Sequence, residues 1–515
     1  MNIVYAVKIF AAMMILLGVM RLVAGKGLRE VMTPADWKAA WPAVAITLFV
    51  SCFSWKQPLF FVFLSLWACF APRLFGKAGE GRLPAYALLM CVSPQFAMEI
   101  QDIGPLKDVM HIDAYRVVEI FILIPEAVRL LARRERPPSP SWLTLSDLAT
   151  AVYLLYVTTK LYGQMNMSSI ARESLGVVLD SALPYYVLSR ACVIADMRRR
   201  ILSMLLFGTV YECTVGIVEG LSRHLLYAQL QYLYGIRWSL AGALTRGDFV
   251  RAQAGLSGAL ILAVLALFGI GLWFVLKPTT KSRPYAVIGL TLLGGMLVTF
   301  SRGPLLVAMV LVVAIFLLRH MQARKFLLLT LVALGIVAAA WSHGLGDLVI
   351  AAIDSVSGGD KTANFNVLYR QELLKTSLAL IQQSPWWGVP NYLAYMQDLR
   401  QGEGIIDLVN TYLIVTLNTG AVGLVLFLMP FVVVLLRLSA SIPEEPSALR
   451  RERIGWIALT LAIMAVVFTT SPVSVVHPIL VWTVAIALGG LQEGLLPRRR
   501  TRLGVRRGDV RPVSS

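Results

Sequence analysis

The sequence TFSRGP at residues 299–304 sets one arginine, Arg302, between two long apolar runs with almost no loop around it. Two apolar runs further on, a polar interval extends from His343 to about Thr411, and it is the longest such interval in the chain. Apolar runs of about 20 residues divided by short polar connections are typical of transmembrane helices. If successive runs cross a membrane, Arg302 and the long polar interval lie at the same face.

Composition supports a membrane protein. Of the 515 residues, 57% are hydrophobic and 15% are charged, whereas a soluble globular domain is roughly 45–50% apolar and about 25% charged. We therefore predict an all-α polytopic membrane protein with about 13–15 transmembrane helices, in a single transmembrane domain that comprises residues 1–515. The candidate spans are 4–23, 40–54, 57–74, 84–100, 115–132, 142–162, 175–195, 201–220, 253–276, 284–300, 303–319, 326–343, 412–437, 454–471 and 474–494.

Clusters of Lys and Arg predict the orientation, because basic residues concentrate in cytoplasmic loops. The clusters can all be cytoplasmic together, and they lie at 133–136, 198–200, 277–283, 319–325, 450–453 and in the tail 496–515. Residues 344–411 then form one large loop at the opposite face. These clusters also account for the formal net charge of +18, so we expect contact with anionic membrane lipid and not with nucleic acid.

The outer loop contains one helical pattern. Apolar residues recur at roughly helical spacing over 367–383, and Pro385 cannot continue a helix. We predict a helix over these residues that lies along the membrane surface, followed by Trp386 and Trp387 at the interface, where Trp is enriched. The alternative is a small extramembrane helix with no part in the chemistry.

Arg302 is the first candidate functional residue, because a charge at the membrane edge is costly to place. Gly303 and Pro304 would begin the next helix, whose free N–H groups and the Arg302 guanidinium would together form a receptor for phosphate. Arg251 comes out at the same face, where it opens the span 253–276, and two arginines can neutralise a diphosphate together. The alternative for Arg302 is a lipid-headgroup anchor without specificity.

Asp407 and Asn410 lie just before the span that begins at residue 412. The Asp407 carboxylate could accept a proton from a sugar hydroxyl, and Asn410 could orient it. The alternative, which position alone favours, is that Asp407 complements the helix dipole as a capping or first-turn residue. Arg172 and Arg370 are basic residues at the outer face, against the topological trend, and we assign them to substrate binding.

Metal and cofactor sites are not expected. The five cysteines lie inside apolar segments, where a free Cys behaves as a small hydrophobic residue, and no Cys or His spacing fits a metal site. Asp180, Arg190 and Glu219 lie within or at the ends of apolar segments. A buried pair among these three would form a stabilising or substrate-lining network.

Four stretches, taken together, resemble motifs of the O-antigen ligase and Wzy-type polymerase superfamily of bacterial envelope enzymes. They are SRG at 301–303, RAQAG at 251–255, the pattern from Arg370 to PWWG at 385–388, and NTYL followed by GAVG at 410–423. The first half resembles the superfamily only in being polytopic, although DSALPYY at 180–186 is similar to members from exopolysaccharide clusters.

This resemblance implies a GT-C-like fold and an inverting, metal-independent glycosyltransferase of the bacterial inner membrane. The loop 344–411 would be periplasmic and the tail 496–515 cytoplasmic. The substrate would be a glycan linked to undecaprenyl diphosphate, with Arg251 and Arg302 on the diphosphate. A chain-length regulator and a flippase would be partner proteins.

The superfamily's loop histidine, the proposed base of the ligases, is replaced here by Val409. This replacement favours a polymerase that extends an exopolysaccharide or O-antigen-type chain from lipid-linked repeat units, with Asp407 as the nearest ionisable candidate for a base. One alternative is an O-antigen ligase that transfers a finished glycan to a lipid or protein acceptor. The other is a flippase or transporter of the same lipid-linked units.

Overall fold

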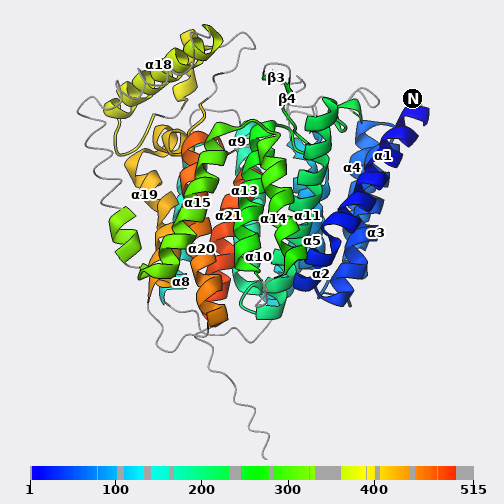
Figure 1. The fold of residues 1–515 in the computed structure, drawn as a ribbon. Coiled ribbons are helices and arrows are strands. Elements are labelled where there is room, and N and C mark those ends of the chain that lie inside the picture. The colour runs from blue at the N-terminus through cyan, green and yellow to red at the C-terminus, as the bar shows by residue number, and fades with distance from the viewer. Residues whose placement is uncertain are drawn as a thin grey trace, which may run out of the picture.

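The structure is a computed structural model, and it shows a bundle of helices that run side by side, with α18 and the strands β3 and β4 at one end (Figure 1). It describes residues 3–77, 79–100, 110–132, 141–161, 167–230, 245–246, 249–277, 282–323, 325–330, 361–389, 391–400, 406, 408–440, 447–472 and 474–493.

The elements of the amino-terminal part are α1 (Ile3–Val23), α2 (Gly25–Val31), α3 (Pro34–Phe53), α4 (Gln57–Phe70), η1 (Ala71–Leu74), α5 (Arg82–Val92), β1 (Ala97–Ile100), β2 (Met110–Asp113), α6 (Ala114–Val118), η2 (Glu119–Leu123), α7 (Ile124–Ala132), α8 (Ser141–Leu161), α9 (Met167–Val177), η3 (Val178–Ala182), α10 (Leu183–Ala191) and α11 (Ala195–Ser222). Those of the carboxyl-terminal part are β3 (Thr245–Arg246), β4 (Phe249–Val250), α13 (Ala259–Val275), α14 (Arg283–Leu297), α15 (Arg302–His320), α18 (Lys361–Gln383), η5 (Tyr392–Leu399), α19 (Thr411–Ser439), α20 (Ser447–Val466), η6 (Val467–Thr469) and α21 (Val476–Glu493).

The predicted fold class, an all-α polytopic membrane protein, is confirmed. Within the described residues, six helical segments are long and apolar enough to cross a membrane, and shorter apolar helices such as α13 and α14 pack among them. The strands in this part of the chain form two antiparallel hairpins, β1–β2 and β3–β4. The full count of spans stays a prediction.

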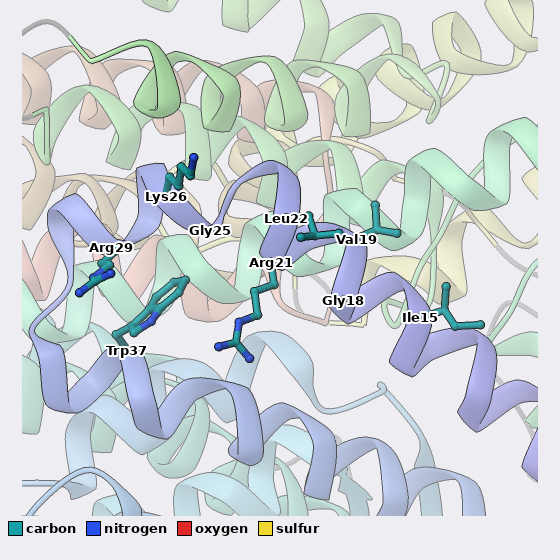
Figure 2. Close-up of a pocket in the computed structure, with 9 residues that line it drawn as sticks. All are labelled: Ile15, Gly18, Val19, Arg21, Leu22, Gly25, Lys26, Arg29 and Trp37. Atoms are coloured by element: carbon teal, nitrogen blue, oxygen red, sulfur yellow. The ribbon is translucent and has the colours of Figure 1, made fainter.

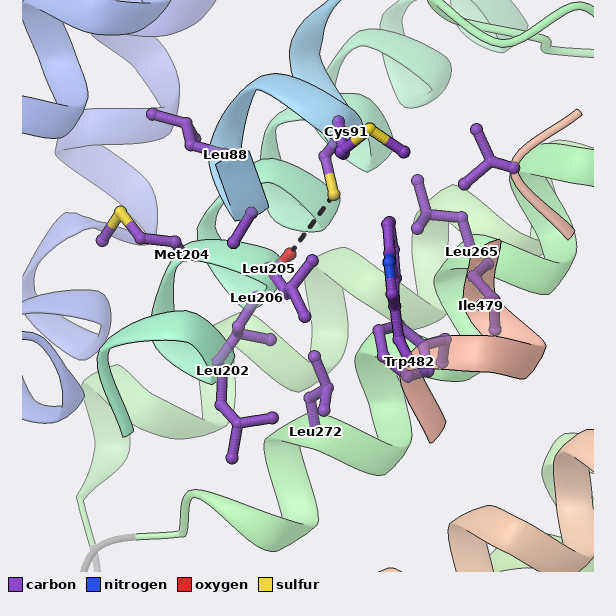
Figure 3. Packing of buried hydrophobic residues seen from close by; sticks show 14 of the residues in the cluster. Leu88, Cys91, Leu202, Met204, Leu205, Leu206, Leu265, Leu272, Ile479 and Trp482 are labelled. Atoms are coloured by element: carbon purple, nitrogen blue, oxygen red, sulfur yellow. Dashed lines mark hydrogen bonds between the residues drawn. The ribbon is translucent and has the colours of Figure 1, made fainter. Parts of the chain in front are cut away.

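Helix α11 lies at the centre of the bundle, against α5, α13 and α14. It is buried over most of its length, whereas α1 and α15 each leave an apolar face exposed. Figure 3 shows the packing, in which the Cys91 thiol lies 3.9 Å from the carbonyl oxygen of Leu205. A Cβ on Gly208 would lie 2.5 Å from Cys91 Cβ, so glycine is required for the close approach of α5 and α11.

Two predicted spans are wrong at one end. The span predicted over 84–100 ends as α5 at Val92, because Pro94 follows and residues 97–100 pair with 110–113 in the β1–β2 hairpin. The span predicted over 253–276 begins at Ala259, and residues 251–258 are irregular. Arg251 therefore does not open a helix, because carboxyl groups of α11 accept the backbone hydrogen bonds of residues 253–255.

Two spans contain a π-helical turn. The span at 114–132 passes from α6 through η2 into α7, and the span at 167–191 passes from α9 through η3 into α10. A π-turn inserts one extra residue into a helix and re-aims the side chains around it. Both turns carry a carboxylate, Glu119 in η2 and Asp180 in η3.

Candidate functional site

The turn between α14 and α15 carries the SRG sequence. Thr299 Oγ1 donates a hydrogen bond to the Met296 carbonyl oxygen at 2.6 Å, and the Ser301 N–H donates to Thr299 Oγ1 at 3.2 Å. Phe300 adopts a φ of 51° between them. The turn is thus stabilised by its own side chain, and it places Arg302 at the first position of a helix of 19 residues.

Arg251 binds this turn directly. Its Nε donates to the Thr299 carbonyl oxygen at 2.9 Å, and its Nη2 donates to Ser301 Oγ at 3.0 Å. Since Ser301 immediately precedes Arg302, the structure brings together the two arginines that the sequence singled out. The Arg302 side chain is exposed and has no hydrogen-bond or ion-pair partner among the residues that the structure describes.

The irregular segment 251–258 is held by a buried carboxylate of α11. Glu219 Oε2 accepts hydrogen bonds from the N–H groups of Gln253 at 3.0 Å and Ala254 at 2.7 Å, and its Oε1 accepts from Leu226 N–H at 2.8 Å. The Glu219 side chain is fully buried. These N–H groups are satisfied by the carboxyl oxygens of Glu219, which explains why the backbone does not need to be helical here.

A second buried carboxylate of α11 holds the same segment. Glu212 Oε2 accepts from the Gly255 N–H at 2.7 Å, and a Cβ on Gly255 would lie 3.0 Å from that oxygen. Glycine at this position therefore permits the close approach. The sequence singles out Glu219 without a partner, but Glu212 was not predicted. The signal for it is a pair of carboxylates inside a long apolar helix, which is costly to bury.

The described residues from 361 to the start of α19, which are 361–389, 391–400, 406 and 408–410, are called the outer segment here. The connection from α20 to α21 contacts both the start of α15 and the end of this segment. A Cβ on Gly303 would lie 2.7 Å from Thr469 Oγ1, so α15 begins in contact with η6. The carbonyl oxygen of the next residue, Thr470, accepts two hydrogen bonds from Thr411. The Thr411 N–H donates at 3.1 Å and the Thr411 hydroxyl donates at 2.7 Å. The starts of α15 and α19 are thus fixed to consecutive residues of one connection.

Asn410 lies at this junction as the N-cap of α19. Its Oδ1 accepts a hydrogen bond from the Leu413 N–H at 3.1 Å, and Ser471 Oγ donates to the Leu408 carbonyl oxygen at 2.7 Å nearby. A capping role, which the sequence analysis weighed for Asp407, therefore belongs to Asn410 in the structure. Asp407 itself lies outside the described residues.

The PWWG sequence at 385–388 packs into a break in α19. At the break Gly420 has a φ of 66°, and the N–H of Ala421 donates to the Pro385 carbonyl oxygen at 2.8 Å. In return the N–H of Val389 donates to the Leu417 carbonyl oxygen at 2.6 Å. The backbone groups that the break in α19 exposes are therefore satisfied by the outer segment.

Two glycines make this junction possible. Gly388 has a φ of 76°, and a Cβ on it would lie 2.7 Å from the Gly420 nitrogen; a Cβ on Gly420 would lie 2.2 Å from the Trp386 carbonyl oxygen. Any side chain at either position would separate the two backbones. The PWWG and GAVG stretches quoted from the sequence thus meet in space.

The predicted outer helix over 367–383 is confirmed as the carboxyl-terminal part of α18, which ends at Gln383. It lies across one end of the bundle (Figure 1) and packs on a small core of its own, formed by Leu373, Leu380, Tyr392, Met396, Leu408 and Leu417. Burial in this core raises the pKa of the Tyr392 hydroxyl above its ordinary value, so the ring stays neutral.

Arg370 and Arg172 lie on separate helices. Arg370 is exposed on α18, and Arg172 lies on α9 with its Nε 3.6 Å from Glu173 Oε1. Their assignment to substrate binding stays a prediction.

The charges named in the first half do not pair with one another. Asp180 accepts two hydrogen bonds from Arg116, at 2.9 Å from Nε and 2.8 Å from Nη2, while Arg190 pairs with Asp147. Next to Asp180, Ser181 Oγ lies 2.6 Å from His477 Nε2 of α21. These pairs join the helices of the first half to each other and to α21.

The charged and polar groups around the SRG turn favour the binding of an anion. The exposed Arg302 lies at the start of α15, beside the first N–H groups of that helix. Arg251 adds a second guanidinium, because it binds the turn that precedes Arg302. Arginine side chains and helix N-termini both bind phosphate oxygens well. No group of three or more His, Cys, Asp or Glu with metal-binding geometry occurs in the described part of the chain.

Residues 287–428 match the family model described as O-antigen ligase. The matched segment contains the SRG turn, α18, the PWWG junction and the break in α19, so the resemblance stated from the sequence is confirmed for this part of the chain. The match to this family model supports, in general terms, glycan transfer of the O-antigen ligase or polymerase type with a lipid-linked glycan as the substrate. No curated protein matches the chain.

Proposed function

We propose that the protein polymerises oligosaccharide repeat units carried on undecaprenyl diphosphate into an exopolysaccharide or O-antigen-type chain. The reaction would take place at the periplasmic face of the inner membrane, with inversion at the anomeric carbon and without a metal. The observation that carries this proposal is the attachment of Arg251 to Thr299 and Ser301, directly beside the exposed Arg302.

In such a reaction the bond from the anomeric carbon to the diphosphate oxygen breaks as the acceptor hydroxyl attacks, and negative charge accumulates on the leaving diphosphate. Arg302 would bind that diphosphate together with the N–H groups at the start of α15. Arg251 would hold the turn in place and add positive charge. Removal of one preorganised donor of this kind costs about 100- to 1,000-fold in rate.

The outer segment would hold the second substrate close to the first. Thr469 and Thr470 fix the start of α15 and the start of α19 side by side, so an acceptor bound against α18 or residues 408–410 would face the diphosphate site. Positioning two lipid-linked sugars in this way removes much of the entropic barrier to transfer. Arg370 on α18 and Arg172 on α9 would contact the bound glycans.

A polymerase is preferred to a ligase because Val409 occupies the position of the ligases' loop histidine. If a base is needed, Asp407 would accept the proton of the acceptor hydroxyl. The family description, O-antigen ligase, keeps the ligase as the second candidate. The two differ in product: loss of a polymerase leaves single repeat units on the carrier lipid, and loss of a ligase leaves long chains on it.

The test is the carrier-lipid glycan profile of a deletion strain that expresses each variant. We expect Arg302→Ala to leave single repeat units and to reduce polymer by about 100-fold or more, and Arg302→Lys to recover only part, because lysine lacks the planar fork. Arg400→Ala removes an exposed arginine of the outer segment and serves as the matched control. Full-length polymer in Arg302→Ala, at normal protein level, would refute the diphosphate site.

Asp407→Asn tests the base separately. Wild-type polymer yield in this variant would reject Asp407 as the base and leave the diphosphate site standing.

A further inference from the structure

A groove opens at the end of the bundle opposite to α18, between the end of α1, the short helix α2 and the start of α3 (Figure 2). Three cationic side chains lie along it: Arg21 from α1, and Lys26 and Arg29 from α2. All three are exposed. The groove lies far in sequence from the matched segment 287–428, and the proposed reaction does not use it.

None of the three cations forms an ion pair with a carboxylate in the described part of the chain. Glu30 accepts a hydrogen bond from Ser282 Oγ at 2.6 Å. Asp36 is fully buried and pairs with Arg200 at 2.7 Å. The groove therefore carries a net positive charge, which favours an anionic occupant.

The wall of the groove is apolar. Leu22 is 82% exposed and Ile15 is 66% exposed, and Val19 lies between them on the same face of α1. In water such a face would be costly, but it fits hydrocarbon chains of a bilayer. Gly18 leaves the wall open, since a Cβ on it would meet no atom within 4 Å.

Trp37 of α3 also lines the groove, and its side chain lies between those of Arg21 and Arg29 (Figure 2). Its ring packs edge-to-face on Trp41 at 5.0 Å between centroids, and Arg21 lies over Trp41 at 5.5 Å. A Cβ on Gly25 would lie 3.2 Å from the Trp37 ring, so glycine at the turn from α1 to α2 lets the ring pack closely against it. Tryptophan and basic residues at a helix end are typical of the membrane–water interface.

We propose that this groove binds an anionic phospholipid of the surrounding bilayer, with its phosphate on Arg21, Lys26 and Arg29 and an acyl chain along Ile15, Val19 and Leu22. A free phosphate would use the cations and leave the apolar wall without a partner. A zwitterionic lipid would use the wall and leave the positive charge uncompensated. An anionic phospholipid satisfies both. Basic pockets between membrane helices bind such headgroups.

Native mass spectrometry of the full-length protein in detergent tests this proposal, with dioleoyl phosphatidylglycerol as the anionic probe and dioleoyl phosphatidylcholine as the zwitterionic probe. Removing each cation near a membrane surface weakens attraction to anionic lipid by about fivefold. We expect the triple variant Arg21→Gln, Lys26→Gln, Arg29→Gln to bind phosphatidylglycerol about 100-fold more weakly, with weak phosphatidylcholine binding unchanged.

Lys38→Gln is the matched control, because Lys38 is an exposed cation on the same helix as Trp37 and does not line the groove. It should leave phosphatidylglycerol binding unchanged. Gly18→Phe fills the apolar wall while the cations remain, so it should also weaken phosphatidylglycerol binding, and it carries the test if the triple variant does not purify as a folded protein.

Three results would overturn the proposal. Equal binding of phosphatidylglycerol by the wild type and the Gly18→Phe or triple variant would show that the groove does not hold the lipid. Equal binding of the two lipids by the wild type would remove the role of charge. Complete displacement by inorganic phosphate would identify the groove as a site for a soluble anion.

Discussion

Two irregular segments lie among the helices of the bundle, and they are held there by different forces. Residues 251–258 are held by carboxylates, because Glu219 and Glu212 of α11 accept hydrogen bonds from three consecutive N–H groups. Residues 385–389 are held by backbone groups, because they bond with α19 where it breaks at Gly420. One segment is fixed by hydrogen bonds to side chains and the other by close packing of backbones.

The difference matches what each segment does. The first segment carries Arg251, and Glu219 and Glu212 beneath it fix the backbone that directly follows this arginine. The second segment connects α18 to the bundle and carries no charge of its own. It is attached by close packing of backbone atoms, which Gly388 and Gly420 permit because both have a positive φ and no side chain.

The largest effect is expected from closing the contact between glycines. Gly420→Val places a branched side chain at a φ of 66° and sets its Cβ 2.2 Å from the Trp386 carbonyl oxygen. We expect a loss of about 4 kcal/mol at the junction from strain and overpacking together. Limited proteolysis should then cut residues 384–390, and polymer should be lost.

Gly18→Ala is the control for Gly420→Val, since its Cβ meets no atom within 4 Å. It should leave both proteolysis and polymer unchanged. Intact resistance to protease in Gly420→Val would mean that the α19 break is not the attachment point of the outer segment.

A smaller effect is expected from the carboxylates. Glu219→Ala leaves three backbone N–H groups without their acceptor, at a cost of about 3 kcal/mol. Polymer should fall because Arg251 is no longer held against Ser301, while residues 384–390 stay protected from protease. Thermal unfolding in detergent and the polymer assay measure the two parts.

Glu219→Gln sharpens this comparison, because glutamine keeps one acceptor oxygen but loses the charge. We expect it to lie between the wild type and Glu219→Ala in both assays. If the two variants behaved alike, charge would be the dominant contribution; if Glu219→Gln behaved like the wild type, hydrogen-bond geometry alone would hold the segment.

The smallest effect is expected at Asn410. Asn410→Ala removes the N-cap of α19 and should cost about 1 kcal/mol of stability, with a modest loss of polymer. Asn410→Asp keeps a capping oxygen and should restore stability. A variant that is stable yet inactive would show that Asn410 contacts the glycan as well as the helix.

Much of the fold follows from apolar runs in the sequence. A run of about 20 apolar residues can satisfy its backbone in a bilayer only as a helix, so α1, α11 and α15 could be predicted from their length and composition. An apolar run does not show where a helix starts when side chains of another helix accept the hydrogen bonds of its first backbone N–H groups. The apolar pattern predicts residues 253–258 as part of a span, and the carboxylates of α11 hold them in an irregular conformation.

The same limit applies to the site. The sequence alone determined that this is a polytopic membrane protein and that Arg251 and Arg302 were the basic residues to examine, because charges are rare and costly at a membrane edge. Tertiary structure decided that Arg251 holds the turn before Arg302 and that Gly388 meets Gly420. Those contacts join residues tens of positions apart, and no local pattern of hydrophobicity or charge encodes which of them will touch.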